Sequence, residues 1–369
     1  MKEQFILPDS TYLLSHSVGR PLKSAQQHFS DTFFAPWEKG QTEPWQQWLS
    51  GVNDFTQQLA KLFNSDAKLF CPQVNLSSAL TKLVHAHPRL NKAKCKVLMS
   101  EQDFPSMGFA LQKSLSEDSE IVFIPASQDV CDANVWQQYL TADIDLVFIS
   151  QVYSNSGKQA PVADILEAAR QRGVLSLVDV AQAAGIIPIN LASLQPDFMI
   201  GSSVKWLCGG PGAAYIWISE AQLPACEPKD VGWFSHENPF EFDIHHFAYH
   251  DSALRFWGGT PSVAPYILAA HSIAWFNDYG VEKVRSHNLA MQQLVIEALG
   301  EIVVSPTRAE HRSGTLILNL GAQQSQLVPC LQSAGVSVDE RHLGARVSFH
   351  LYNDEDDARQ LVHALQRLI

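Results

Sequence analysis

The sequence has no long apolar run, no basic segment and no closely spaced cysteines. No stretch approaches the roughly 20 consecutive apolar residues that a membrane-spanning helix needs. The first apolar run is broken at once by Pro8 and Asp9, which is unlike a signal peptide. The 26 basic residues are outnumbered by 38 acidic ones, and a formal net charge of −12 makes nucleic acid and anionic membranes poor partners. We therefore expect a cytoplasmic protein that binds neither.

The six cysteines are scattered, without a Cys-x-x-Cys pair or a cluster with histidine. This pattern argues against a structural zinc site and a disulfide framework, and it fits a reducing compartment. No expected strand is followed by a Gly-x-Gly-x-x-Gly motif, so a nicotinamide-dependent oxidoreductase is disfavoured. The chain has 369 residues, of which 46% are hydrophobic and 17% charged. This is enough core-forming material for one large and one smaller domain.

Short β-rich runs alternate with helical segments through the first two thirds of the chain. The expected strands are at 96–100, 120–127, 145–152, 174–180, 197–203 and 213–219. The expected helices are at 44–64, 76–86, 107–115 and 161–173. Nearly continuous Val, Ile, Leu and Phe in strands separated by helices predict a parallel sheet covered on both faces. In such a sheet, function is expected at the carboxyl ends of the strands.

The pattern changes after residue 219. Residues 226–262 are rich in aromatic residues, His, Gly and Pro, which predicts a long ordered loop region. A smaller α+β unit is expected beyond it, with helical segments at 263–300, 324–334 and 354–368 and strands at 315–320 and 345–353. The predicted division of the chain is an N-terminal segment at 1–45, a large domain at 46–270 and a small C-terminal domain at 271–369.

Two charged residues stand in unusually apolar surroundings. Lys205 lies between two apolar strands and precedes a Gly-Gly-Pro-Gly run (209–212), and Asp179 ends another apolar strand. Burial would free the lysine amine as a nucleophile for a Schiff base, and the carboxylate would need a cation or a set of donors. Alternatively, the lysine reaches solvent at a strand end and the aspartate caps a helix. Together, however, the two residues are what a pyridoxal phosphate site needs, because the carboxylate keeps the pyridine nitrogen protonated.

Several motifs, in order along nearly the whole chain, resemble the fold-type I pyridoxal-phosphate enzymes of the class V aminotransferase group, and within it the kynureninases. The matching segments are SHSVGRP (15–21), VNL (74–76), DFPS (103–106), residues 178–218, GWFSHENPFEF (232–242), RFWGGTP (255–261) and RVSFHLYN (346–353). The resemblance implies an α/β fold with a mainly parallel seven-stranded sheet. It also implies pyridoxal 5'-phosphate as cofactor, an α-amino acid as substrate, and a homodimer with shared active sites.

The same resemblance implies roles for individual residues. Lys205 corresponds to the lysine that carries the cofactor and moves protons, and Asp179 to the partner of the pyridine nitrogen. Phe104 corresponds to the residue that stacks on the cofactor ring, and Gln182 to one near its 3′-oxygen. The phosphate is expected at the start of the helix after VNL. The residues that correspond to its ligands are Gln73, Ser202, Ser203, Trp233 and Thr260, and Thr260 would come from the neighbouring subunit. The corresponding substrate-binding residues are Arg346, which holds the α-carboxylate with Arg341 as a weaker alternative, together with His16 and Asn155.

Departures from the kynureninase pattern leave alternatives open. Val204 stands where kynureninases have a tyrosine, and Pro72 has no N–H at a position where the family uses one for the phosphate. A catalytically weakened cofactor-binding protein is therefore one alternative. Another is a cysteine or selenocysteine lyase or an epimerase, although residues 338–345, before the final strand, contain no cysteine for sulfur transfer. The favoured activity is hydrolytic C–C cleavage of the kynureninase type, or that of a related class V aminotransferase.

Overall fold

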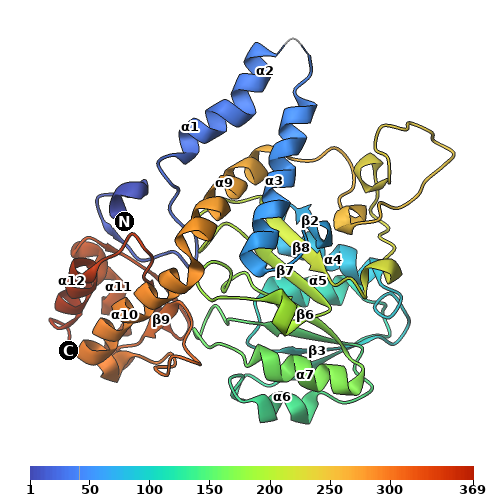
Figure 1. Cartoon of the computed structure of the whole chain (residues 1–369). Coiled ribbons are helices and arrows are strands. Elements are labelled where there is room, and N and C mark those ends of the chain that lie inside the picture. Colours follow the sequence, from blue (N-terminus) through green and yellow to red (C-terminus); the bar gives the residue numbers. More distant parts are fainter. Residues whose placement is uncertain (41) are drawn as a thin grey trace.

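The computed structural model describes residues 1–40 and 42–369, and a seven-stranded sheet forms its centre (Figure 1). In spatial order the strands are β2 (Phe70–Gln73), β8 (Ala214–Ile218), β7 (Phe198–Ser202), β6 (Leu175–Asp179), β5 (Leu146–Ser150), β3 (Lys96–Ser100) and β4 (Glu120–Ile124). All pairs from β7 to β4 are parallel, and β8 pairs antiparallel with both of its neighbours. The prediction of an α/β fold with a mainly parallel sheet is confirmed.

Helices shield the sheet from solvent, so β5, β6 and β8 are buried along their whole length. The helices of this part are α3 (Trp45–Phe63), α4 (Leu76–Ala86), α5 (Pro105–Ser114), α6 (Ala133–Tyr139), α7 (Val162–Arg172), α8 (Leu191–Leu194) and α9 (Ala264–Tyr279). Helix α3 packs along α9 (Figure 1) through a stripe at helical spacing that includes Val52, Phe55 and Leu59. It ends where Asn64 adopts a left-handed conformation.

The C-terminal part has its own three-stranded antiparallel sheet, with β12 (Gly344–Ser348) between β11 (Asp339–Arg341) and β9 (Thr315–Leu318). The helices of this part are α10 (Val281–Leu299), α11 (Gln324–Ser333) and α12 (Glu355–Leu365). Its hydrophobic core is separate from that of the large sheet, and the two cores meet along α10, where Val284 belongs to one and Met291 to the other. We propose this second core as the smaller domain. The boundaries expected at residues 45 and 270 stay predictions, and residue 270 lies within α9.

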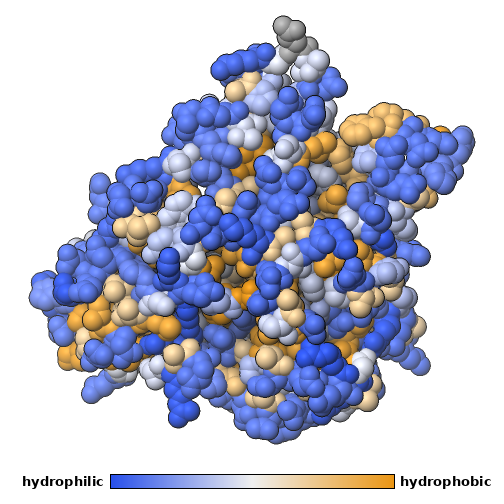
Figure 2. Space-filling view, in the orientation of Figure 1, coloured by the Kyte–Doolittle hydropathy of each residue, from blue (hydrophilic) through white to orange (hydrophobic). Residues whose placement is uncertain are grey.

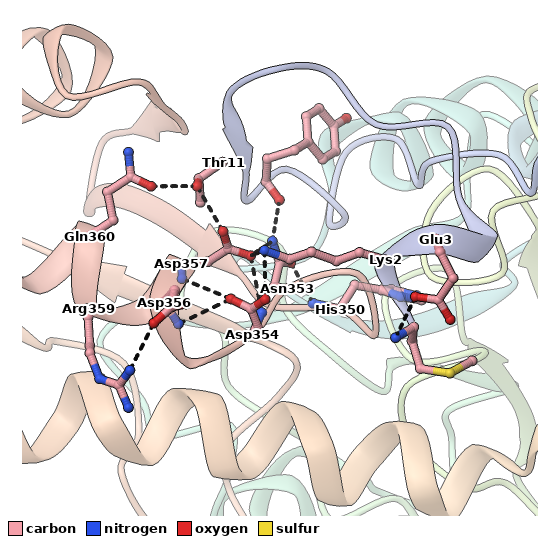
Figure 3. A network of polar contacts seen from close by, with 12 residues as sticks. Lys2, Glu3, Thr11, His350, Asn353, Asp354, Asp356, Asp357, Arg359 and Gln360 are labelled. Atoms are coloured by element: carbon pink, nitrogen blue, oxygen red, sulfur yellow. Dashed lines mark hydrogen bonds and ion pairs between the residues drawn. The ribbon is translucent and has the colours of Figure 1, made fainter.

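The N-terminal segment crosses between the two cores. Strand β1 (Thr11–Tyr12) pairs in parallel with β10 (Val336–Ser337). Figure 3 shows the polar contacts that fix this segment to α12, where Thr11 Oγ1 donates to Asp357 Oδ1 at 2.9 Å and the Lys2 amine contacts Asp354 and Asp357 at 2.8 and 3.0 Å. Beyond β1, Leu22 is buried in the core of the large sheet. The segment then continues through α1 (Ala25–Phe29), a π-helical turn (Ser30–Phe34) and α2 (Ala35–Lys39).

Residues 226–262 form the expected loop region, with only short 3-10 turns at Trp233–Ser235 and Ala253–Phe256. The loop projects at the upper right of Figure 1, and Figure 2 shows hydrophobic surface there. Its exposed apolar side chains include Phe240, Phe242 and Ile244. No helix in the described part of the chain is both long and apolar enough to cross a membrane.

Candidate active site

A pocket of about 200 Å³ opens at the carboxyl ends of the parallel strands. Ser150, Asp179 and Ser202 are the last residues of β5, β6 and β7, and Lys205 follows β7 by three residues. The other lining residues come from the beginnings of α4 and α5 and from the loops that follow β5, β6 and β7. Because parallel strands end at one edge of a sheet, residues far apart in the sequence meet here, as the sequence analysis expected.

Lys205 lies in a tight turn between β7 and β8. Ser203 fixes the base of this turn, since its N–H and its hydroxyl both donate to Ala213 O, at 3.0 and 2.8 Å. Gly19 of the N-terminal segment donates to Val204 O at 2.9 Å, and a Cβ on Gly19 would clash with the Lys205 carbonyl oxygen. A glycine is therefore required where the N-terminal segment lies against the lysine turn.

The Lys205 amine faces the pocket without a hydrogen bond or ion pair among the described residues. Burial lowers its pKa to about 8, the charge of Asp179 opposes this shift, and the charges of Arg346 and Arg341 add to it. About a tenth of the amine is therefore neutral at pH 7, far more than for a lysine in water, as a nucleophilic lysine requires.

Asp179 presents a carboxylate to the same pocket. Its Oδ1 accepts a hydrogen bond from the Ala181 N–H at 2.8 Å, and its Oδ2 has no hydrogen bond among the described residues. Burial raises the pKa of this carboxyl, while the Ala181 N–H and the positive charge of Lys205 oppose the shift. A cationic ring nitrogen would supply the missing partner of the free oxygen.

A second buried carboxyl, that of Asp103, lies behind the pocket at the end of β3. Its Oδ2 accepts a hydrogen bond from the Ser100 N–H at 2.8 Å, and its Oδ1 is buried with no partner among the described residues. Burial raises the pKa of Asp103 to about 7 although the neighbouring Ser150 and the Ser100 N–H oppose the shift, and the charge of Asp179 adds to the rise. The sequence analysis did not single out this residue.

The pocket is suited to a phosphate at the beginning of α4. The Asn75 side chain caps this helix by accepting from the Ser78 N–H at 2.8 Å, and the Leu76 and Ser77 N–H groups have no partner among the described residues. A helix N-terminus with free N–H groups favours an anion. The Ser77 and Ser202 side chains line the pocket close by. Ser77 was missed, although the expected helix start pointed to this turn.

Phe104 and Gln182 also line the pocket. Phe104 precedes the first turn of α5, and 43% of its surface is exposed, so its ring is accessible from the pocket. Gln182 Nε2 donates to His16 O at 3.0 Å, which links the site to the N-terminal segment. Both residues lie where a flat aromatic ligand would contact them.

Other expected residues lie outside this pocket. Gln73 Nε2 donates to Phe256 O at 3.2 Å, and the Ser203 hydroxyl is taken by Ala213 O. Trp233 lines a different hollow, in the loop region, and Thr260 is exposed. Asn155 is half-buried beyond the pocket, and its Oδ1 has no partner among the described residues.

Arg346 and His16, which are both buried, form a cluster with Asp339, a residue whose side chain is 36% exposed and that the sequence analysis did not name. Arg346 Nε donates to Asp339 Oδ1 at 2.8 Å, Nη2 donates to Asp339 Oδ2, and Nη1 donates to Ser154 O at 3.3 Å. His16 Nε2 lies 2.9 Å from Asp339 Oδ1, and its Nδ1 lies 2.6 Å from Ser348 Oγ. The guanidinium of Arg346 thus already holds a carboxylate.

The donor set of the pocket fits pyridoxal phosphate. The lysine amine matches its aldehyde, the aspartate its ring nitrogen, the phenylalanine its ring, and the helix start with two serines its phosphate. The fold and this set of groups are those of a pyridoxal-phosphate-dependent enzyme. The model of the family "Aminotransferase class-V" matches residues 21–361, and the chain belongs to that family.

Two relatives illustrate the range of names within the family. The chain is 26% identical to the kynureninase of Deinococcus radiodurans over 351 residues, which cover 89% of this chain and 83% of that protein. It is 22% identical to the uncharacterized aminotransferase YcbU of Bacillus subtilis over 348 residues, which cover 94% of this chain and 90% of that protein. Among solved structures, the cysteine desulfurase of Thermococcus onnurineus superposes with a TM-score of 0.86 at 18% identity, covering 98% of this chain and 95% of that one. This last likeness shows the fold alone.

Proposed function

We propose that this enzyme carries pyridoxal phosphate on Lys205 and hydrolyses the Cβ–Cγ bond of a kynurenine-like α-amino acid. One observation carries the cofactor assignment, namely that Lys205 and Asp179 line one pocket with Phe104 and Gln182. The relatives named kynureninase support the choice of substrate. The coexistence of the lysine and the aspartate also argues against a catalytically weakened protein, which has no chemical need for that pair.

Bound pyridoxal phosphate supplies an electron sink for the bonds at the α-carbon of an amino acid. The neutral Nζ of Lys205 would hold the cofactor, and as a free amine it would take the α-proton and return a proton to the product. The carboxylate of Asp179 would hold the ring nitrogen and favour its positive charge. Phe104 would pack against the ring, and Gln182 would donate a hydrogen bond to the cofactor.

The phosphate would be held by the Leu76 and Ser77 N–H groups and by the hydroxyls of Ser77 and Ser202. Gln73 and Ser203 then support the walls of the site from behind, since their side chains are engaged elsewhere. Thr260, which is exposed, would reach the phosphate of a neighbouring subunit in a homodimer. Light scattering of the purified protein tests the dimer.

The six cysteines are free thiols, which supports a cytoplasmic location.

A second candidate is a lyase acting on cysteine or selenocysteine. Val204, which stands where kynureninases have a tyrosine, and Met107 both line the pocket, so this wall is apolar and suits a different amino acid. Transfer of the sulfur to an enzyme thiol is not part of this candidate, because residues 338–345 contain no cysteine and burial raises the pKa of the Cys208 thiol. Formation of sulfide from L-cysteine would distinguish this candidate from C–C cleavage.

The experiment begins with the visible absorbance of the purified protein after incubation with pyridoxal phosphate. Borohydride should fix the cofactor to the unsubstituted protein and to a Lys61→Ala control, whose lysine is exposed on α3, but not to Lys205→Ala. L-Kynurenine and 3-hydroxykynurenine are then added, and the fluorescence of the anthranilate product is recorded. A protein that takes up no cofactor contradicts the whole proposal. A loaded protein that forms no anthranilate contradicts only the substrate.

A further inference from the structure

The guanidinium of Arg346 keeps part of its donor set free. Its Nε and Nη2 donate to the two oxygens of Asp339, and its Nη1 donates to Ser154 O at 3.3 Å. One N–H on each of its two terminal nitrogens therefore has no partner among the described residues. Ser154 lines the pocket, and the charge of Arg346 contributes to the lowered pKa of Lys205. The tip of this guanidinium can thus hold a carboxylate beside the pocket.

Asp339, which sets the orientation of Arg346, is the least sheltered member of the cluster. Its side chain is 36% exposed, whereas those of Arg346 and His16 are 3% and 1% exposed. It begins β11, a short strand at the edge of the small sheet. Solvent weakens a partly exposed ion pair, so the contact with Arg346 does not by itself fix this carboxylate. A second donor on its buried side is needed to hold it in place.

His16 supplies this second donor, and its partners determine where its proton lies. Although burial opposes the shift, hydrogen bonds from His16 and Arg346 hold the pKa of Asp339 well below its usual range, so Asp339 is charged. Burial lowers the pKa of His16 to about 4, so its imidazole is neutral near pH 7 and carries one proton. A charged carboxylate only accepts hydrogen bonds. The proton is therefore on Nε2, which donates to Asp339 Oδ1 at 2.9 Å.

Two hydroxyl groups hold the other side of the imidazole. Nδ1 has no proton and accepts from the Ser348 hydroxyl at 2.6 Å. Ser348 Oγ in turn accepts from Thr315 Oγ1 at 2.9 Å, because its own hydrogen is already used. Ser348 and Thr315 are both buried and lie opposite each other in the pairing of β12 with β9. Both ring nitrogens of His16 are engaged, so a substrate can sense this side chain only through Asp339 and Arg346.

We propose that His16 is a positioning residue for the carboxylate of the amino-acid substrate. It holds Asp339 against Nε and Nη2 of Arg346, and it thereby presents the two free N–H groups of Arg346 to the substrate. This inference rests on the proposed function, because it assumes an amino acid in the Lys205 pocket. A chain of hydrogen bonds then connects the small sheet to the substrate, and Arg346 is the member of this chain that touches it.

The test uses L-alanine and L-alaninamide, two probes that differ only at the carboxyl group. Both are titrated into the pyridoxal-phosphate-loaded enzyme at one pH, and the change in the visible spectrum gives their dissociation constants. Arg346→Lys should weaken L-alanine by about tenfold and L-alaninamide by less than about twofold, because an ammonium group lacks the paired donors of a guanidinium. An unchanged constant for L-alanine in Arg346→Lys would overturn the proposal.

Replacements of His16 change position without changing charge, because the imidazole is neutral. His16→Asn should weaken L-alanine by about tenfold and L-alaninamide by less than about twofold, since the shorter amide reaches Ser348 but not Asp339. His16→Gln should keep most of the affinity, because its amide nitrogen reaches the place of Nε2 and can donate to Asp339. His87→Asn, at a buried histidine that ends α4, is the matched control and should leave both constants unchanged.

A double-variant cycle shows whether His16 acts through Asp339. In an Asp339→Ala background, His16→Asn should change neither constant further, because the link to Arg346 is already lost. An equal loss with and without Asp339 contradicts the proposal, and so does an equal loss for both probes. If His16→Asn binds L-alanine as tightly as the unsubstituted enzyme or more tightly, Asp339 does not orient Arg346 and the proposal is wrong.

Thermal unfolding of each variant is recorded alongside, since His16 is buried. A merely structural histidine would lower the unfolding temperature of His16→Asn without changing the ratio of the two constants, as expected for His87→Asn. If His16→Asn does not fold, Ser348→Ala frees the imidazole to turn away from Asp339. This variant should show the same selective loss of L-alanine affinity, and the absence of that loss refutes the proposal.

The outcome is separate from that for the proposed function. A protein that takes up no cofactor contradicts both proposals. A loaded enzyme that loses L-alanine affinity selectively in His16→Asn but forms no anthranilate refutes only the kynurenine assignment. A loaded enzyme that forms anthranilate but shows no selective loss refutes only the role of His16.

Discussion

The buried carboxyl of Asp103 makes a measurable prediction about stability and pH. Replacement by asparagine keeps the shape of the side chain and its acceptor for the Ser100 N–H, while it removes the ionisation. Asp103 is 7% exposed, and its pKa is about 7 because burial disfavours the carboxylate. In an unfolded chain an aspartate has a pKa of about 3.9.

The magnitude follows from the difference between these two pKa values. Between about pH 4 and pH 7 the folded protein holds a proton on Asp103 that the unfolded chain has released. The free energy of unfolding therefore falls as the pH rises through this window. Above pH 7 the contribution of Asp103 to this free energy no longer changes. Each pKa unit corresponds to about 1.4 kcal/mol, so Asp103 accounts for a loss of about 4 kcal/mol. The Asp103→Asn variant lacks this loss.

The assay is urea unfolding of both proteins, followed by tryptophan fluorescence at several pH values from 4.5 to 8.5. The contributions of other titrating groups cancel when the two free energies of unfolding are subtracted. This difference should shift by several kcal/mol in favour of the variant as the pH rises. Asp164→Asn, at an exposed position of α7, is the control for replacing a carboxylate by an amide away from the buried site. A constant difference for Asp103→Asn would mean that this carboxyl ionises normally, and the reasoning from burial would be refuted.

Three further predictions concern the site and its support. Borohydride trapping of pyridoxal phosphate on Lys205 should accelerate with rising pH and level off above about pH 8, where the amine is neutral, and a rate that is independent of pH would contradict the lowered pKa. Gly201→Ala should lower the unfolding free energy by at least about 2 kcal/mol, measured by urea unfolding, because its Cβ would clash with the Tyr215 ring in β8; an unchanged value contradicts this packing. Asn288→Ala should cost about 2–3 kcal/mol in the same assay, because two buried carbonyls lose their donor, and a cost below 0.5 kcal/mol would show that they are satisfied otherwise.

Much of the sheet could be predicted because its strands are short, continuously apolar and buried on both faces. The elements that were missed lack this signal. Strand β2 has four residues and contains Pro72, which the edge of a sheet tolerates. The helical stretch expected at 263–300 is two helices, because Gly280 adopts a positive φ of 97° between them. A single glycine in an otherwise periodic stretch does not reveal such a break.

In the candidate site too, some residues could be predicted from the local sequence, and others could not because only the fold brings them together. Lys205 and Asp179 could be proposed from the sequence because each stands at the end of an apolar strand, and parallel strands end together. The partners of Arg346 could not, because its salt bridge to Asp339 depends on the pairing of β11 with β12. The contact of His16 with Asp339 spans 323 residues, and no local pattern shows it. The roles of all these residues stay predictions until the variants are measured.

The N-terminal segment has a consequence for how the protein is made. Gly19 and His16 leave the ribosome early, but Ser348, which bonds His16, is synthesised 332 residues later. At about 5–20 residues per second this delay is roughly 20–60 s. For the last 130 of these residues, from the end of β8 at Ile218 to Ser348, the strands beside Asp179 and Lys205 are complete while His16 still lacks this partner. The contact that fixes His16, whose carbonyl accepts from Gln182, is therefore a product of the last stage of translation.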